Sequence, residues 1–289
     1  MRPPRPRPRR PRAFVIGPVS WNVLVHVPEL PAAEPHAVFA QWHHEGLGGT
    51  SAGKALNLRR LGLDVSLYTL IGDDEPGRKI RRALARSGVD HSVRRSVNGS
   101  ERHVNLMDPA GRRLSIYLTL PEAEAAVPAG LDDALAGADA VVVDLAEHSR
   151  SALPVARALG KAVWCDLHDY DGRSAFHTQF RAAADYLFVS DERLPDPHRF
   201  LREQIAAGKR LAVCTRGARG ALALVPGGEI VQVPAEPVAE VVDTNGAGDA
   251  FFAGFLCAHL AGRSLRECLG LACRTAAACV GSAELAAGG

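Results

Sequence analysis

A ten-residue segment near the C-terminus, Asp-Thr-Asn-Gly-Ala-Gly-Asp-Ala-Phe-Phe at residues 243–252, contains the residues best suited to chemistry. The apolar residues that follow it recur at helical spacing and predict a helix over residues 250–260, with the glycines at its entrance. A helix entrance has backbone N–H groups without internal partners and the positive end of the helix dipole, so it binds anions such as phosphate. Asp249 would repel that anion unless it has a chemical task, such as accepting a proton.

This combination predicts phosphoryl transfer to an alcohol. Asp249 would deprotonate the attacking hydroxyl, while the N–H groups of Gly246, Ala247, Gly248 and Asp249 itself would hold the charge on the transferred group. The structural alternative is a tight turn followed by an ordinary first-turn aspartate. The flanking Asp-Thr-Asn and Phe-Phe residues favour the functional interpretation.

With these residues the segment resembles the C-terminal signature of the ribokinase family, the pfkB-type carbohydrate kinases. That signature is Asp-Thr-x-Gly-Ala-Gly-Asp-x-Phe, and every specified position matches. The resemblance implies a kinase that transfers phosphate from ATP to a hydroxyl of a sugar or nucleoside. It also implies a site for a monovalent cation such as K⁺ at Asp243 and Asn245.

The N-terminal part of the chain extends the resemblance to the acceptor side. An apolar stretch at residues 14–17 is followed by Asn22, where the family has an Asp that binds sugar hydroxyls. Residues 48–55 are similar to the family's N-terminal signature, but Gly53 stands where the family has Asn. The resemblance implies acceptor contacts from Asn22, Gly48, Gly49 and Gly53. The two departures indicate an acceptor other than that of an ordinary ribokinase.

The nucleotide side is similar to the family at residues 215–221, which match its Thr-x-Gly-x-x-Gly turn, and residues 72–77 match its Gly-x-Asp-x-x-Gly turn. We therefore expect nucleotide contacts from Thr215, Gly217, Gly220, Ser190 and Asn245. After the apolar run at 186–189 the family has Asn-x-x-Glu, and this chain has Ser190 and Arg193. Glu192, one residue early, is the candidate for organising Mg²⁺, which the charge of a triphosphate requires.

Two other functions fit parts of the sequence. Residues 48–54 also satisfy the P-loop pattern Gly-x-x-x-x-Gly-Lys, and a P-loop NTPase would depend on Lys54. Against it, Ala55 lacks the hydroxyl that would bind magnesium, and the preceding residues 41–45 are too polar for a buried strand. A catalytically weakened sugar or nucleotide sensor would explain Gly53, Ser190 and Arg193, but the intact Asp249 argues for an enzyme.

The elements that must position these residues alternate along most of the chain. Short apolar runs occur at residues 64–71, 138–143, 161–165, 186–189 and 211–215, and helical patterns at 52–61, 78–87, 151–159 and 200–207. This alternation predicts an α/β fold with a mostly parallel, doubly wound sheet between two helical layers. Ligands then bind beyond the carboxyl ends of the strands, where the glycine-rich loops fall.

Two segments, residues 23–42 and 101–120, break the alternation and are rich in β-formers, and Asp108-Pro-Ala-Gly111 predicts a hairpin turn in the second. The resemblance implies a small β-sheet lid that closes over the acceptor and forms a homodimer. Asn105 and His103 could reach the acceptor from this lid. We expect a core of residues 13–20, 46–98 and 121–289, and a lid of residues 21–45 and 99–120.

Composition limits the remaining possibilities. The chain has 289 residues, 47% of them hydrophobic, and a net charge of +2, but residues 1–12 hold six arginines and no acid. We expect this Arg/Pro segment to be a disordered tail, with nucleic-acid binding unlikely because the rest of the chain is mildly acidic. No run approaches the roughly 18 apolar residues of a membrane span. Six cysteines without a Cys-x-x-Cys pair fit a reduced, cytoplasmic protein.

Overall fold

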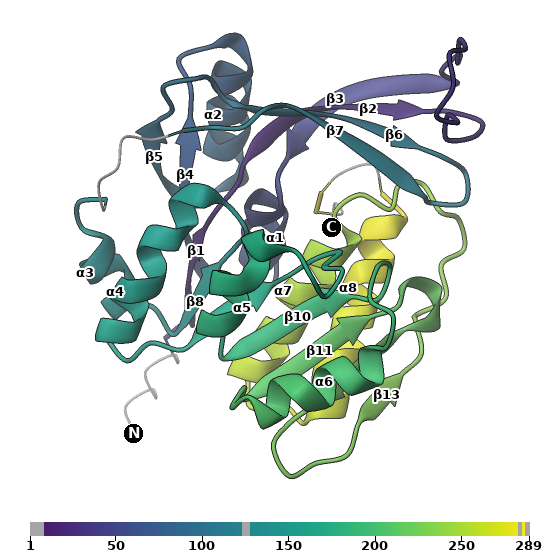
Figure 1. Cartoon of the computed structure of the whole chain (residues 1–289). Coiled ribbons are helices and arrows are strands. Elements are labelled where there is room, and N and C mark those ends of the chain that lie inside the picture. The colour runs from purple at the N-terminus through teal and green to yellow at the C-terminus, as the bar shows by residue number, and fades with distance from the viewer. Residues whose placement is uncertain (1–8, 123–127, 283–284, 287–289) are drawn as a thin grey trace, which may run out of the picture.

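The computed structural model describes residues 9–122, 128–282 and 285–286, and its main feature is a nine-stranded sheet. The strand order is β13-β12-β11-β10-β9-β8-β1-β4-β5 (Figure 1). Neighbours from β11 to β5 are parallel, whereas β12 and β13 are antiparallel additions at one edge. The strands are β1 (Arg12–Ile16), β4 (Asp64–Ile71), β5 (Asp90–Arg95), β8 (Ala140–Val143), β9 (Val163–Asp166), β10 (Tyr186–Ser190), β11 (Leu211–Thr215), β12 (Ala221–Leu224) and β13 (Val231–Val233).

Helices cover both faces of this sheet and confirm the predicted three-layer α/β fold. In β1, Ala13 and Val15 pack into one core, while Phe14 and Ile16 pack into the other, as the alternation of a strand requires. The first core is completed by α1 (Thr50–Arg60), α2 (Glu75–Ser87), α7 (Ala247–Leu260) and α8 (Leu265–Val280). The second is completed by α3 (Leu131–Ala136), α4 (Ala152–Ala158), α5 (Thr178–Ala183) and α6 (Pro197–Ala206).

Helix α2 begins three residues before the predicted start, and the cap explains why. The Asp74 side chain accepts a hydrogen bond from the backbone N–H of Gly77, and a proline lies in the first turn, where its missing N–H costs nothing. Helix α7 likewise begins at Ala247 rather than at residue 250. Gly248 and Asp249 therefore belong to the helix itself.

A separate four-stranded sheet has the order β3-β2-β6-β7 and forms the small sheet expected for a lid. Its strands are β2 (Ser20–His26), β3 (Trp42–Gly48), β6 (Glu101–Met107) and β7 (Arg113–Thr119), and Figure 1 shows them running along the top of the molecule. The antiparallel pairing of β6 with β7 confirms the predicted hairpin. The connection after Asp108 bends back at Gly111, whose φ of 76° is easily reached only by glycine.

The two faces of the lid differ in chemistry. Cross-strand pairing places Asn22 opposite His103, and His103 opposite Tyr117, on the inner face. The neighbouring outer positions form apolar rows, Val23–Val104–Ile116 and Val25–Leu106–Leu114. Buried polar side chains thus gather on one side and partly exposed aliphatic side chains on the other.

Of the Arg/Pro tail, residues 1–8 lie outside the described residues. Arg9 is described and pairs with Asp139 at 2.8 Å, just before β1 begins at Arg12. In the part of the chain that the structure describes, no helix is long and apolar enough to cross a membrane.

Candidate active site

The carboxyl ends of adjacent parallel strands bring polar residues to one edge of the large sheet. Asp144 follows β8, Asp166 ends β9, Ser190 ends β10 and Thr215 ends β11. The registers pair Phe188 with Asp166, and Ser190 with Thr215, so these strand ends lie side by side. Ligands of open parallel sheets bind at this edge.

The glycine-rich loop delivers the predicted helix entrance to the same region. Gly246 caps α7 with a φ of 80° and turns the chain into the helix. The N–H of Ala247 donates to the carbonyl of Thr244 at 3.3 Å, whereas the N–H groups of Gly246, Gly248 and Asp249 have no hydrogen-bond partner among the described residues. The entrance therefore has the unpartnered donors that an anion hole requires.

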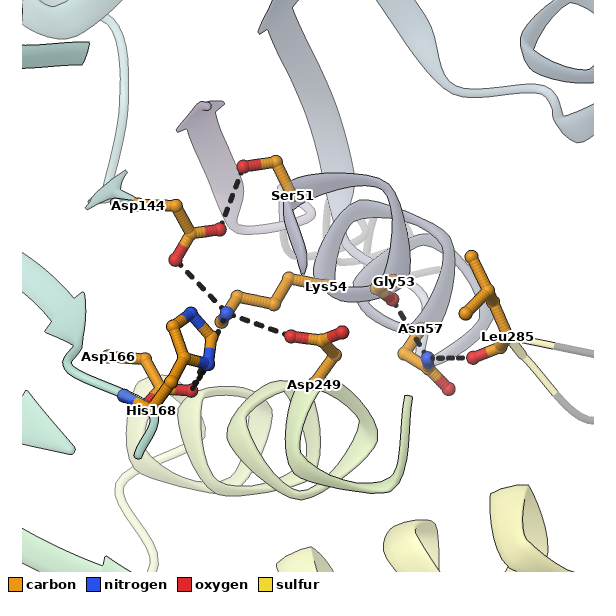
Figure 2. A network of polar contacts seen from close by, with 9 residues as sticks. All are labelled: Ser51, Gly53, Lys54, Asn57, Asp144, Asp166, His168, Asp249 and Leu285. Atoms are coloured by element: carbon orange, nitrogen blue, oxygen red, sulfur yellow. Dashed lines mark hydrogen bonds and ion pairs between the residues drawn. The ribbon is translucent and has the colours of Figure 1, made fainter. Parts of the chain in front are cut away.

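Asp249 lies in a buried charge cluster whose centre is Lys54 (Figure 2). The Lys54 Nζ is 2.9 Å from Asp249 Oδ1, 3.0 Å from Asp144 Oδ1 and 3.6 Å from Asp166 Oδ2. The Lys54 side chain is fully buried, while the side chains of Asp166 and Asp249 are each 9% exposed. One ammonium thus joins carboxylates from three separate elements.

Helix α1 approaches Asp249 closely because residue 53 is glycine. A Cβ at Gly53 would lie 2.5 Å from Asp249 Oδ2 and 2.9 Å from its Cγ, too close for any side chain. The Asn that the family resemblance led us to expect at this position would therefore displace the Asp249 carboxylate.

Burial and charge act in opposite directions on these groups. Burial raises the pKa of Asp249, and the Lys54 ammonium offsets part of that rise. Burial also raises the pKa of Asp166, but His168 and Lys54 outweigh it and bring the net pKa below its usual value. Burial alone would lower the pKa of Lys54, yet the three carboxylates raise it above normal. Lys54 is therefore charged at every physiological pH.

His168 has an unusual backbone at the rim of the cluster. Its φ of 52° is the sole positive value for a non-glycine residue in the described ranges. Its N–H donates to Asp166 Oδ1 at 2.9 Å, and its carbonyl accepts from the Ser190 N–H at 2.6 Å. Asp166, His168 and Asp249 have possible ligand atoms within 4.8 Å of one another, and the Lys54 ammonium is the cation that these carboxylates already contact.

The predicted acceptor residues lie on the inner face of the lid and beside it. Asn22 and Asn105 are each 3% exposed, and Ser20 of β2, which was not predicted from the sequence, is also buried; the side-chain oxygen of each of the three has no partner among the described residues. A side chain at Gly48 would collide with the amide of Asn22. Gly49, with a φ of 91°, precedes α1. His103 Nε2 lies 2.8 Å from Glu101 Oε1, and its ring packs against Tyr117.

The predicted nucleotide residues lie beyond β10 and β11. Gly217 and Gly220 both have positive φ, 54° and 83°, and shape the turn after Thr215. The Ser190 hydroxyl accepts from the N–H of Glu192 at 3.3 Å, and the Glu192 side chain is exposed. Arg193 lies 3.7 Å from Asp169 and 3.6 Å from Asp171, turned toward the loop after β9.

The predicted cation residues precede α7. Asp243 is 4% exposed, and its Oδ1 accepts from the N–H of Asn245 at 2.7 Å. Asn245 Oδ1 in turn accepts from Arg113 of the lid at 3.4 Å. Both residues lie next to the helix entrance, while Glu192 belongs to a different loop.

Sequence analysis did not single out Asp144, Asp166 or His168, and it considered Lys54 only as a P-loop lysine. A usable signal was present, because each aspartate ends or directly follows a wholly buried strand, where polar residues of parallel sheets meet. The P-loop interpretation does not fit the structure. Gly48 ends a lid strand, and Lys54 points into the carboxylate cluster instead of presenting a free ammonium to a phosphate.

Comparisons with known proteins agree with this geometry. The chain is 36% identical over 261 residues to acarbose 7(IV)-phosphotransferase of an Actinoplanes strain, covering 89% of this chain and 87% of the relative. It is 30% identical over 241 residues to fructoselysine 6-kinase of Escherichia coli, covering 82% and 91%. The solved structure of a microbiome-derived acarbose kinase superposes with a TM-score of 0.82 at 28% identity, over 95% and 94% of the two chains.

The fold itself is shared more widely. Ribokinase of Arabidopsis thaliana, solved with ribose and ATP, superposes with a TM-score of 0.76 at 22% identity, over 96% and 94% of the chains. The family model described as pfkB family carbohydrate kinase matches residues 12–288. The chain therefore belongs to the pfkB family of carbohydrate kinases, ATP-dependent phosphotransferases that act on an alcohol group.

Proposed function

We propose that this kinase transfers the γ-phosphoryl group of ATP to a hydroxyl of a carbohydrate, with Asp249 as the general base. The observation that carries the proposal is the buried Asp249 carboxylate within the first turn of α7, beside unpartnered N–H groups. The acceptor hydroxyl gives its proton to Asp249, its oxygen bonds to the γ-phosphorus, and the bond to the departing ADP breaks. The N–H groups of Gly246, Gly248 and Asp249 hold the charge on the transferred group.

Two cations complete the proposal. The exposed carboxylate of Glu192, beside Ser190 at the end of β10, has the oxygen donors that Mg²⁺ prefers. When bound, that ion neutralises the triphosphate. Asp243 offers a carboxylate next to the helix entrance for a monovalent cation such as K⁺.

A polyhydroxylated acceptor fits the inner face of the lid. Side-chain oxygens of Ser20, Asn22 and Asn105 are buried without partners among the described residues, which is costly unless a ligand satisfies them. Hydroxyls of a sugar provide the missing donors. The names of the two relatives reported above, acarbose and fructoselysine kinases, support a sugar-containing acceptor.

The test is Asp249→Asn, assayed for ATP consumption against a panel of sugars, oligosaccharides and nucleosides. Loss of a general base lowers kcat by about two to four orders of magnitude. The matched control is Asp64→Asn. Asp64 is the first residue of β4, so it lies at the edge of the sheet opposite to the carboxyl ends of the strands, and its side chain is 50% exposed. Near-normal turnover in a folded Asp249→Asn protein would overturn the mechanism. A P-loop enzyme would be favoured only if Asp249→Asn stayed active while Lys54→Ala lost its activity.

We also propose a homodimer formed through the outer face of the lid. Leu114, Ile116 and Leu118 of β7 are 43%, 45% and 50% exposed, and Leu114 and Ile116 continue the apolar rows of β2 and β6. An apolar face of this kind is typical of a protein–protein interface.

A further inference from the structure

Lys54 has no part in the base and anion-hole mechanism, although it lies at the centre of the site. Its side chain is fully buried, and its Nζ contacts Asp249, Asp144 and Asp166 (Figure 2). A buried ammonium is stable only when it is paired with opposite charges and hydrogen-bonded. One carboxylate is enough to pair with the charge of Lys54, and the cluster contains three. The ammonium therefore also stabilises the ionised forms of these carboxylates.

Helix α1 holds the Asp249 carboxylate at both of its oxygens. Lys54 donates to Oδ1 at 2.9 Å, and the preceding residue, Gly53, leaves the space that Oδ2 occupies. One turn earlier, Ser51 donates to Asp144 Oδ2 at 2.8 Å and orients the second carboxylate that Lys54 contacts. Three positions within about one turn of this helix thus supply the charge, the space and the supporting hydrogen bond.

We propose that Lys54 is a positioning residue for phosphoryl transfer, which keeps Asp249 ionised and fixes the orientation of its carboxylate toward the acceptor hydroxyl. This inference rests on the proposed role of Asp249 as the base. It also explains Gly53, because a larger residue there would displace Asp249 Oδ2 and change the orientation of the carboxylate.

All the charged groups that act on Asp249 enter this inference. Lys54 and His168 favour its ionised form, whereas Asp144 and burial oppose it. Asp166 lies across Lys54, and the buried thiol of Cys279 also interacts electrostatically with Asp249. Without Lys54, three carboxylates would share one buried site, and the Asp249 proton would be held more tightly.

The experiment is the pH dependence of kcat for wild type, Lys54→Gln, Lys54→Arg and Gly53→Ala, using ATP and the sugar found in the panel. For Lys54→Gln we expect the acidic limb of the profile to move upward by about one to three pH units. At pH values below the acidic limb this variant loses about tenfold in kcat for each pH unit by which the limb has moved, and kcat recovers as the pH is raised. KM for ATP stays unchanged.

Gly53→Ala separates position from charge. It keeps Lys54 and adds one methyl group against the Asp249 carboxylate, so its thermal unfolding is compared with that of wild type before a loss of activity is assigned to position. We expect kcat to fall while the acidic limb stays at the wild-type pH. We expect Lys54→Arg, which retains the charge, to have its acidic limb at the wild-type pH and a kcat below that of wild type.

Thermal unfolding and ATP binding are measured for each variant, so that a merely structural role is recognised. If folded Lys54→Gln protein keeps the wild-type pH profile, or if its lost activity does not recover at high pH, the inference is wrong. If Lys54→Gln cannot be folded, Gly53→Ala decides, and unchanged kcat in that variant overturns the inference. Near-normal activity of Asp249→Asn would instead refute the proposed base, so the two failures are distinguishable.

Discussion

The Thr244 hydroxyl donates a hydrogen bond to the carbonyl of Gly111 at 3.2 Å and so joins the tip of the lid to the loop before α7. A Cβ at Gly111 would lie 2.9 Å from the Thr244 methyl, so the backbone at Gly111 lies close against the Thr244 side chain. Arg113 and Asn245 form a second contact of 3.4 Å between the same segments. The tip of the lid therefore touches the loop that leads into α7.

Weakening this contact should loosen lid closure. In Thr244→Val the hydroxyl is lost and the shape is kept, which removes a hydrogen bond with a net contribution of about 0.5–1.5 kcal/mol. We expect the acceptor KM to rise about two- to tenfold and ATP hydrolysis without acceptor to increase, because an open lid admits water. Both are measured by ADP release with and without sugar. Thr244→Ser, which keeps the hydroxyl, is the control. Equal ATP hydrolysis in the two variants would show that the Thr244–Gly111 hydrogen bond does not hold the lid closed.

Acceptor binding should depend on Asn22. Its Oδ1 is buried without a partner among the described residues, and removing a buried group that pairs with ligand costs about 1–3 kcal/mol. Asn22→Ala should therefore raise the acceptor KM roughly five- to 150-fold and leave the ATP KM unchanged. Steady-state kinetics with each substrate varied in turn tests this. A rise in the ATP KM alone would place Asn22 elsewhere in the reaction.

The sequence predicted the large sheet well because its signals are local. The predicted strands at residues 64–71 and 211–215 have the same bounds in the structure, since turns and charged residues delimit each apolar run. Helix starts were less accurate. The cap of Asp74 and the proline beside it extend α2 toward the N-terminus, and neither belongs to an apolar pattern.

The charge cluster could not be predicted in the same way. Lys54, Asp144 and Asp166 come from different elements, and only the order β9-β8-β1 of the sheet brings them together. Gly53 illustrates the same limit. In the sequence, Gly53 is noticed only because it replaces the Asn of the family signature. In the structure, its lack of a side chain leaves the space that the Asp249 carboxylate occupies.

Stability should depend on Asp74 in a pH-dependent manner. Burial would raise the pKa of Asp74, but hydrogen bonds from Ser100 and Gly77 outweigh it and lower the pKa. A lowered folded-state pKa gives stability that is present above the unfolded value near 3.9 and is lost as the pH falls through the folded value. Asp74→Ala should reduce the free energy of unfolding by about 1–3 kcal/mol at pH 7. Urea unfolding at several pH values should show this difference shrinking below about pH 4, and Asp74→Asn, which keeps a capping side chain, should lose less.

His168 should matter for activity more than for stability. Its left-handed backbone costs about 1 kcal/mol or more for a side chain with a Cβ, and glycine removes that cost. His168→Gly should therefore unfold at no lower urea concentration than wild type. Its kcat should fall about fivefold, the equivalent of about 1 kcal/mol, because a group that favours ionised Asp249 is lost. The control for the backbone is His168→Asn, because Asn also tolerates the left-handed conformation. Unchanged kcat in His168→Gly would limit His168 to a structural role.

The outer face of the lid should control the oligomeric state. Ile116 ends the apolar row Val23–Val104–Ile116 on the edge strand β7 and is 45% exposed, so a charge there would be desolvated in any dimer that buries this face. Ile116→Glu should convert a dimer to a monomer in light scattering at micromolar concentration, since an unpaired buried charge costs several kcal/mol. Arg82→Glu, on the exposed side of α2, is the matched control because it also adds an acidic charge but is not on a strand of the lid. If wild type is a monomer, or if Ile116→Glu stays dimeric, the chains do not meet through this surface.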